Sequence, residues 1–238
     1  MASIQTHVPG RPPIELVAYY DSFAWYYPNC EPQTKRWFVQ QARPDWVYLD
    51  CGANIGYYSI LFAQLSPHGH IHAVEPTATA DMLRTNLAHH RLGNVTVHQQ
   101  AVGRYAGRRT EKIFRLWGGP PEEMEYDFET IDTLVARLAP TRLDCIKIDV
   151  DSFDFEVLMG AEQTLAKYDP WLVVELNHAL GVRGYSNLAA AEWLLDHGYR
   201  HCQILDHDNF VARRSAPPES FATGKAMTLH FAPPHEPA

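Results

Sequence analysis

The segment Asp50–Gly56 has the composition of a ligand-binding turn. It reads Asp-Cys-Gly-Ala-Asn-Ile-Gly and follows a short apolar run. Gly52 and Gly56 leave room for backbone to pass close to a ligand, and Gly52 can also take a positive φ. Asn54 stands where a dinucleotide-binding motif would need its middle glycine, and Asp50 would repel a pyrophosphate. We therefore expect a nucleoside ligand that carries positive charge, and S-adenosylmethionine has both an amine and a sulfonium.

Two later segments would complete such a site. Glu75 ends the next strand candidate about twenty residues after Gly56, where an acid can accept hydrogen bonds from both ribose hydroxyls. Gln100 and Ala101 lie at the end of the third strand candidate, where backbone groups would face an adenine edge. The residues expected to bind the cofactor are Asp50, Gly52, Asn54, Gly56, Glu75, Gln100, Ala101 and Asp149.

Polar side chains also follow two later strand candidates. Asp149 and Asp151 come after one apolar run, and Glu175, Asn177 and His178 come after the next. Because the carboxyl ends of parallel strands meet at one edge of a sheet, we expect these side chains to converge there. Methyl transfer needs an acceptor atom aligned ~3 Å from the methyl carbon and relieved of its proton. The cluster is therefore the candidate catalytic site.

Two ways of activating the acceptor are open at this stage. In one, Asp149, Glu175 and Asn177 supply oxygen ligands to Mg²⁺, which lowers the pKa of a substrate hydroxyl. In the other, His178 is the general base beside Asp149, since histidine exchanges protons near neutral pH. Alignment of the acceptor without either device is the third possibility.

Alternating strands and helices must position these residues. The expected strands are 47–50, 69–75, 95–102, 144–149 and 171–176, and the expected helices include 79–91, 130–138, 153–168 and 186–197. This alternation predicts an α/β fold, a mostly parallel sheet with helices on both faces. Strand candidates after residue 199 follow one another directly, which predicts an antiparallel C-terminal edge.

The N-terminal region is rich in aromatic residues. Within nine positions stand Tyr19, Tyr20, Phe23, Trp25, Tyr26 and Tyr27. They form either an arm packed on the core or a lid over an acceptor pocket, since tyrosine and tryptophan combine an apolar body with a polar tip. Thr34 is expected to cap a helix that runs to about Ala42.

Six blocks, in order, resemble the FkbM-type methyltransferases. They are Asp50–Tyr58, His72–Pro76, Ala101–Gly103, Thr130–Leu134, Asp144–Val150 and Val157–Ala161. The resemblance spans about residues 45–205 and implies a Rossmann-like class I fold with a seven-stranded sheet. It also implies S-adenosylmethionine as the cofactor and O-methylation of hydroxyls on secondary metabolites or sugars. One block departs from the family pattern Asp-Val-Glu-Gly-x-Glu, because Ser152 and Phe153 follow Asp151 here.

The resemblance and the pattern of elements together suggest three regions. Residues 1–44 would form the aromatic arm and its helix, residues 45–231 the methyltransferase domain, and residues 232–238 a frayed tail. No repeat or linker divides the chain.

Composition limits the partners. Hydrophobic residues make up 46 % of the chain and the formal charge is −8, so a nucleic acid would gain no long-range attraction. The four cysteines contain no Cys-x-x-Cys pair, which favours free thiols in a reducing compartment. Without a signal-like or membrane-spanning stretch, a cytoplasmic protein is expected, with a small-molecule acceptor, no membrane contact and a homodimer as an option.

Two other functions fit the same residues. N-methylation of an amine or peptide would make the acid cluster a site for a substrate ammonium. A non-catalytic adenosine-binding module would need only the cofactor residues, and turnover on any acceptor would exclude it.

Overall fold

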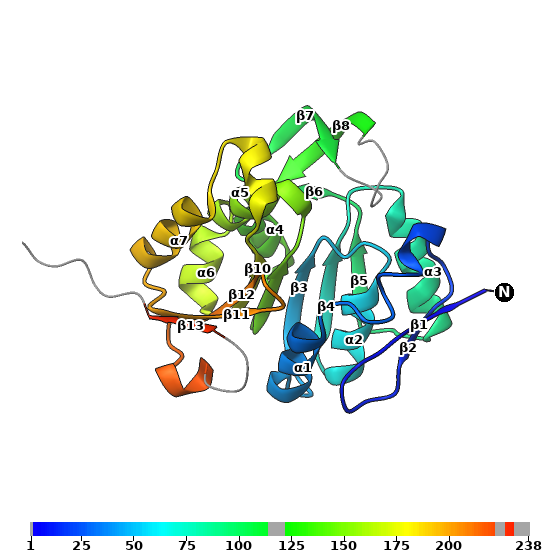
Figure 1. Ribbon diagram of the computed structural model, residues 1–238. Helices are drawn as coiled ribbons and strands as arrows, with labels where there is room; N and C mark the ends of the chain where they lie inside the picture. The colour runs from blue at the N-terminus through cyan, green and yellow to red at the C-terminus, as the bar shows by residue number, and fades with distance from the viewer. Residues whose placement is uncertain (1, 114–121, 222–226, 231–238) are drawn as a thin grey trace, which may run out of the picture.

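The main sheet contains eight strands within the part of the chain that the computed structural model describes, residues 2–113, 122–221 and 227–230 (Figure 1). In sheet order the strands are β13 (Met227–His230), β11 (His201–Leu205), β12 (Asn209–Ala212), β10 (Trp171–Glu175), β9 (Cys145–Ile148), β3 (Val47–Cys51), β4 (His70–Val74) and β5 (Val95–His98). The five strands from β10 to β5 are parallel, whereas β12, β11 and β13 pair antiparallel. The predicted α/β fold is confirmed, and β13 adds an outer strand to the seven expected.

Helices cover both faces of this sheet because its strands are apolar on both sides. On β3, Tyr48 packs into one core and Leu49 into the other. The first core holds α1 (Pro32–Gln41), α2 (Tyr57–Leu65) and α3 (Thr79–His89), and the second holds α4 (Ile131–Leu138), α5 (Asp154–Met159), α6 (Glu162–Tyr168) and α7 (Asn187–Asp196). Strand order reverses between β3 and β9, so their carboxyl ends open a crevice.

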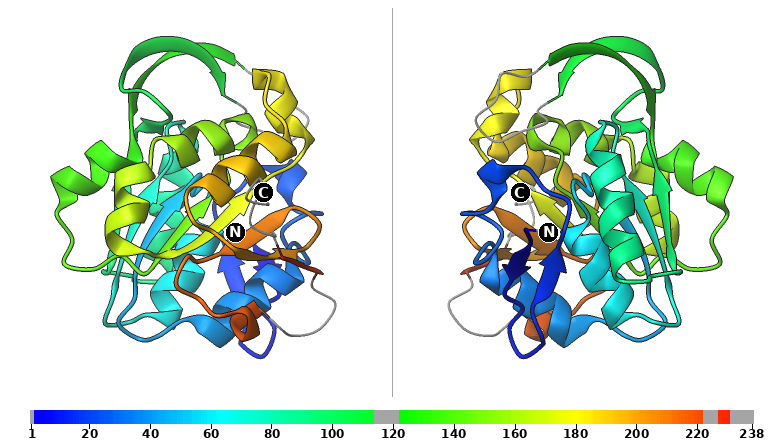
Figure 2. Two further views of the ribbon diagram at one scale, coloured as in Figure 1. Left: turned by 90° about the vertical axis from the view of Figure 1, so that its left-hand side faces the viewer. Right: turned by 90° about the vertical axis from the view of Figure 1, so that its right-hand side faces the viewer.

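Two expected elements are divided in the structure. The strand expected at 95–102 is β5 followed by β6 (Ala101–Val102), which joins β7 (Gly107–Ile113) and β8 (Glu122–Glu129) in a separate small sheet. In both views of Figure 2, the β7–β8 hairpin arches over the top of the molecule. The helix expected at 153–168 breaks after α5, because the carbonyl of Gly160 accepts from the amide of Asp132 at 2.9 Å.

The N-terminal arm is anchored in the first core. It begins with a hairpin of β1 (Ile4–Thr6) and β2 (Ile14–Leu16), which lies beside α2 in Figure 2. Phe23 and Tyr27 are buried, whereas Trp25 is exposed. Both readings of the arm therefore describe part of it, and its role as a lid stays a prediction.

Helix α1 is not capped by Thr34, contrary to the prediction. It begins two residues earlier, and a carboxylate from the β11–β12 turn takes the capping position. The oxygens of Asp206 accept from the amides of Gln33 at 3.1 Å and Thr34 at 2.7 Å. A cap supplied from so far along the chain leaves no local sequence signal.

All four cysteines are buried and free, as expected. Within the described ranges, every helix is too short or too polar to cross a bilayer.

Candidate functional site

A cavity of about 780 Å³ lies at the carboxyl ends of the parallel strands, beside the point where strand order reverses. Its walls come from the loops after β3, β4, β9 and β10, together with β6 and the N-terminal arm. Eight of the predicted site residues line it: Gly52, Asn54, Glu75, Ala101, Asp149, Glu175, Asn177 and His178. The fold thus brings the expected cofactor and catalytic residues to one cavity.

The loop after β3 is shaped by backbone that favours glycine. Gly52, Asn54 and Gly56 all have positive φ, at 85°, 49° and 94°. A Cβ on Gly52 would lie 1.7 Å from the carbonyl oxygen of Asp149, so the loops after β3 and β9 touch through backbone alone. This backbone contact, which we call the Gly52 cradle, leaves no room for a side chain at Gly52 and fixes two of the loops that line the cavity against each other.

Glu75 is held in place at the cavity wall. Its Oε2 accepts from the amide of Asn54 at 3.0 Å, and its Oε1 accepts from the amide and hydroxyl of Thr77 at 2.9 and 2.6 Å. Burial raises the pKa of this carboxyl, and the hydrogen bonds from Thr77 and Asn54 oppose that rise. Oε1 thus already accepts two hydrogen bonds, and Oε2 keeps a lone pair for a ribose hydroxyl, so the site fits an adenosine group.

Three predicted cofactor residues lie behind the cavity wall and do not line it. Asp50 is fully buried and accepts from the hydroxyl of Ser59 at 2.5 Å, and burial raises its pKa. Gly56 packs where a Cβ would meet Leu83. The side chain of Gln100 turns away, because its Oε1 accepts from Arg137 at 3.4 Å. Asp50 and Gly56 support the loop from behind, and Gln100 is placed outside the site.

Lys147 is the main residue that sequence reasoning missed. It lies on β9 with a side chain 1 % exposed, and its Nζ is 2.6 Å from Oδ2 of Asp149 and 4.5 Å from the ring centroid of Tyr58. Burial works to lower the pKa of this ammonium, but the charges of Asp149, Glu31 and Asp50 outweigh burial and raise it overall. The cavity therefore contains a fixed positive charge.

Glu31 is the second missed residue. It has a φ of 41° at the start of α1, which turns the chain into the cavity wall. Its Oε2 accepts from the hydroxyl of Tyr58 at 2.9 Å, and its Oε1 accepts from the side-chain amide of Asn209 at 2.7 Å. Burial raises the pKa of this carboxyl, and the charge of Lys147 opposes the rise. Glu31 thus connects the arm, the sheet and the C-terminal hairpin at one point.

The residues at and after the end of β10 also line the cavity. Burial, with the charge of Asp149, raises the pKa of Glu175. Asn177 begins the short 3-10 helix η3 (His178–Arg183), and its Oδ1 accepts from the amide of Ala179 at 2.8 Å. His178 is exposed and lies at the cavity edge.

The expected magnesium ligands share the cavity but do not fit a metal site. The carboxylate of Asp149 is paired with Lys147, and the side-chain oxygen of Asn177 already accepts a backbone hydrogen bond. Among the described residues, no three His, Cys, Asp or Glu side chains are grouped closely enough to hold an ion. We therefore assign no chemical step to a metal.

Ser152 and Phe153, the two residues that depart from the family pattern, both contact Arg183. The guanidinium of Arg183 lies 3.1 Å from the ring centroid of Phe153 and donates to the hydroxyl of Ser152 at 3.2 Å. Arg183 also donates to Glu111 of β7 at 3.1 Å. Ser152 and Phe153 thus join the loop after β9 to η3 and to the small sheet.

Comparison with known proteins gives the family. The model of the methyltransferase FkbM domain matches residues 50–201. A methyltransferase FkbM structure from Methylobacillus flagellatus KT is similar with a TM-score of 0.54 and 17 % identity, covering 73 % of this chain. The match covers 44 % of that structure's chain, so this protein corresponds to under half of its length.

A second solved structure is more distant. The precorrin-6y C5,15-methyltransferase from Geobacter metallireducens GS-15 has a TM-score of 0.45 and 18 % identity, covering 74 % of this chain and 82 % of its own. No curated protein matches the sequence. The family match over residues 50–201 includes the cofactor loop, Glu75 and the ends of β9 and β10. The chain belongs to the FkbM family of S-adenosylmethionine-dependent methyltransferases.

Proposed function

We propose that the protein transfers a methyl group from S-adenosylmethionine to a hydroxyl of a small, uncharged acceptor. The supporting observation is a single cavity of about 780 Å³ that is large enough for two ligands and is lined by two kinds of residue. We assign the Gly52 loop and Glu75 to a cofactor end, and Lys147, Glu31 and the tyrosine side chains to an acceptor end.

The first end suits the cofactor. Glu75 accepts from the ribose, the β6 residues Ala101 and Val102 border the adenine, and the Gly52 loop lies beside the chain that carries the sulfur. When bound, S-adenosylmethionine supplies an electrophilic methyl group. Asp151, whose pKa burial raises to about 7, borders this end and carries a charge opposite to the sulfonium when ionised.

The second end defines the acceptor by its charge. Carboxyl groups outnumber cations here, since Glu31, Glu175 and Asp208 line the wall and Lys147 is matched to Asp149. An anionic acceptor would be repelled, and the tyrosine rings favour a molecule with hydroxyl and apolar surface. The same carboxyls would suit an amine, which keeps N-methylation as the second candidate.

His178 is the base that this arrangement supports. Burial raises the pKa values of Glu31 and Glu175, and both oxygens of Glu31 already accept hydrogen bonds, from Tyr58 and Asn209. Asp149 is balanced by Lys147, which leaves His178 at the cavity edge to take the hydroxyl proton. The proton then leaves to solvent from an exposed ring.

Chelation and a His178→Ala variant test this choice. Methyl transfer is expected to continue unchanged in EDTA, while His178→Ala loses ~10²–10⁴-fold in turnover because the acceptor proton has no receiver. His68→Ala, which removes an exposed histidine outside the cavity, is the control and should keep full activity. Loss of activity in EDTA with recovery on added Mg²⁺ would establish the metal mechanism instead. Release of methylated amine from a mixed acceptor set would favour N-methylation.

A Glu75→Ala variant tests the cofactor end. The variant is expected to bind S-adenosylhomocysteine at least about tenfold more weakly, because a ribose hydrogen bond to a buried carboxylate is lost. Calorimetry on both proteins measures the difference, and Glu15→Ala, an acid of β2 outside the cavity, is the control. Equal affinities of the Glu75→Ala variant and the unaltered protein would contradict this placement of the ribose.

A further inference from the structure

A second cavity lies at the opposite end of the same strands. It has a volume of about 580 Å³ and is bordered by residues at or before the starts of β3, β9 and β10. Trp46 precedes β3, Asp144 precedes β9, and Trp171 begins β10. The first cavity follows the carboxyl ends of these strands, so the length of the strands separates the two cavities. Nothing in the methyl-transfer proposal uses the second cavity.

The walls of the second cavity are strongly basic. Its lining includes the four cations Arg43, Arg142, Lys167 and Arg213 and the single acid Asp144. The whole chain has a formal charge of −8, so the excess of positive charge in this cavity is opposite in sign to the net charge of the protein. Four like charges that share a cavity repel one another, and an anion bound among them would relieve that repulsion.

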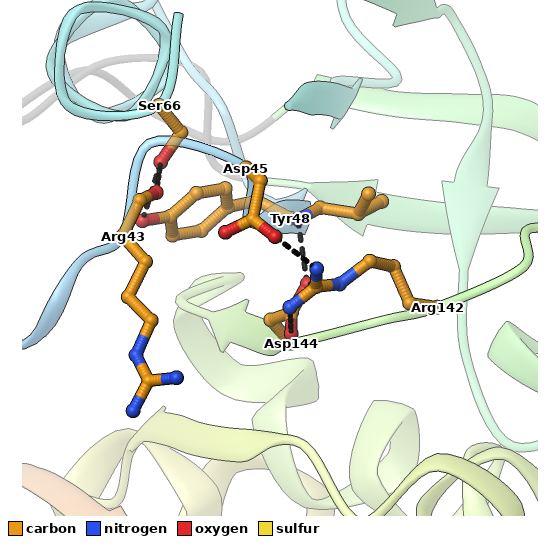
Figure 3. Close-up of polar contacts among 7 residues, drawn as sticks. Arg43, Asp45, Tyr48, Ser66, Arg142 and Asp144 are labelled. Atoms are coloured by element: carbon orange, nitrogen blue, oxygen red, sulfur yellow. Dashed lines mark hydrogen bonds and ion pairs between the residues drawn. The ribbon is translucent and has the colours of Figure 1, made fainter. Parts of the chain in front are cut away.

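One of the four cations is fixed by neighbouring acids. Arg142 donates to Asp144 through Nε at 2.8 Å and through a terminal nitrogen at 2.6 Å, and it also pairs with Asp45 (Figure 3). Asp144 in turn accepts from the amide of Val47 at 2.8 Å. These contacts use most donors of Arg142 and make it a rigid part of the wall.

The other cations keep donors available. Figure 3 shows the side chain of Arg43 extending away from Asp45, while its carbonyl accepts from the hydroxyl of Ser66 at 2.7 Å. Within the described residues, neither Arg43 nor Lys167 has an acid partner, and the Lys167 ammonium donates to the Tyr168 hydroxyl at 3.0 Å. Arg213 forms an ion pair through Nε with Oδ2 of Asp169 at 3.5 Å, and this Nε makes no hydrogen bond within the described residues.

We propose that this cavity binds a pyrophosphate group. Guanidinium and ammonium donors from three separate segments match the several oxygens of such an anion, and guanidinium groups can bind phosphate through two parallel bonds. The indoles of Trp46 and Trp171 are 5 % and 6 % exposed and offer no open face for a base to stack on.

Titration calorimetry with sodium pyrophosphate tests the site on the full chain at constant ionic strength. We expect saturable binding of one pyrophosphate, and a loss of about tenfold or more in affinity for Arg43→Ala/Lys167→Ala, because two charge-assisted contacts disappear. Both residues are exposed, so the core stays intact. The matched control is Arg84→Ala/Lys112→Ala, which removes the same charge from positions outside both cavities and should bind as the unaltered protein does.

Four further outcomes decide the proposal. Absence of saturable binding up to about 10 mM would overturn it, since a weaker interaction is not a site. Equal weakening in the control pair would reduce the effect to net charge and overturn it as well. Competition by S-adenosylhomocysteine would place pyrophosphate in the first cavity, which also overturns it. Tighter binding of ADP than of pyrophosphate would support the site. It would also indicate that the natural ligand is a larger molecule that carries a diphosphate group.

Discussion

A Lys147→Met variant is expected to lose methyl transfer and much of its folding stability. The change keeps the length of the side chain but removes the ammonium that lies 2.6 Å from Asp149. Breaking a buried ion pair leaves a charge without compensation, and the cost here is about 2–4 kcal/mol, reduced because Asp149 keeps some solvent exposure. Turnover should fall by ~10²-fold or more, because the acceptor end loses its only fixed positive charge among the described lining residues.

Urea unfolding and a rate assay measure the two effects. The stability difference from the unaltered protein should shrink as pH falls through the carboxyl range, because protonated acids no longer need a cation. Lys112→Met, an exposed position on β7, is the control and should change neither quantity. If Lys147→Met unfolds at the same urea concentration as the unaltered protein, the ion pair contributes no net stability and this account of the site fails.

A Gly52→Ala variant should lose nearly all activity through a single methyl group. The added Cβ would start 1.7 Å from the carbonyl oxygen of Asp149, and the backbone φ of 85° is already unfavourable for alanine. The loops after β3 and β9 must therefore separate by more than an ångström. Displacement on this scale costs ~10²-fold in turnover, and cofactor affinity should fall by more than about tenfold.

Gly93→Ala is the matched control for this variant. A Cβ at Gly93 would meet nothing within 4 Å, so the same chemical change should leave rate and affinity intact. Calorimetry with S-adenosylhomocysteine separates a binding defect from loss of fold, which circular dichroism reports. Normal cofactor affinity in Gly52→Ala would show that the Gly52 cradle is not needed for cofactor binding.

The cofactor end could be predicted because its signals are local. Gly52, Asn54 and Glu75 lie within two neighbouring strand–loop units, and the spacing alone places them together. Gln100 does not line the cavity, because the chain leaves the main sheet after β5 and the Gln100 side chain turns to Arg137, so its contact with adenine stays a prediction. That departure has no marker in the sequence.

The acceptor end depends on contacts between distant parts of the chain, which a sequence pattern does not reveal. Glu31 meets Asn209 across 178 positions. Lys147 did leave a signal that went unused, since a lysine inside a strand covered on both faces must have an acid partner nearby. Asp149, two positions later on the same face, is that partner.

The cap on α1 also sets the order in which the site is completed during synthesis. Asp206 reaches back 173 positions to the amide of Gln33, and Asn209 reaches Glu31 from the same turn. A ribosome-bound chain that has emerged only to β10 holds α1 without this cap, and Glu31 then has the Tyr58 hydroxyl but not Asn209 as a donor. The acceptor wall is therefore completed only after the β11–β12 hairpin has left the exit tunnel, whatever the rest of the sheet has already formed.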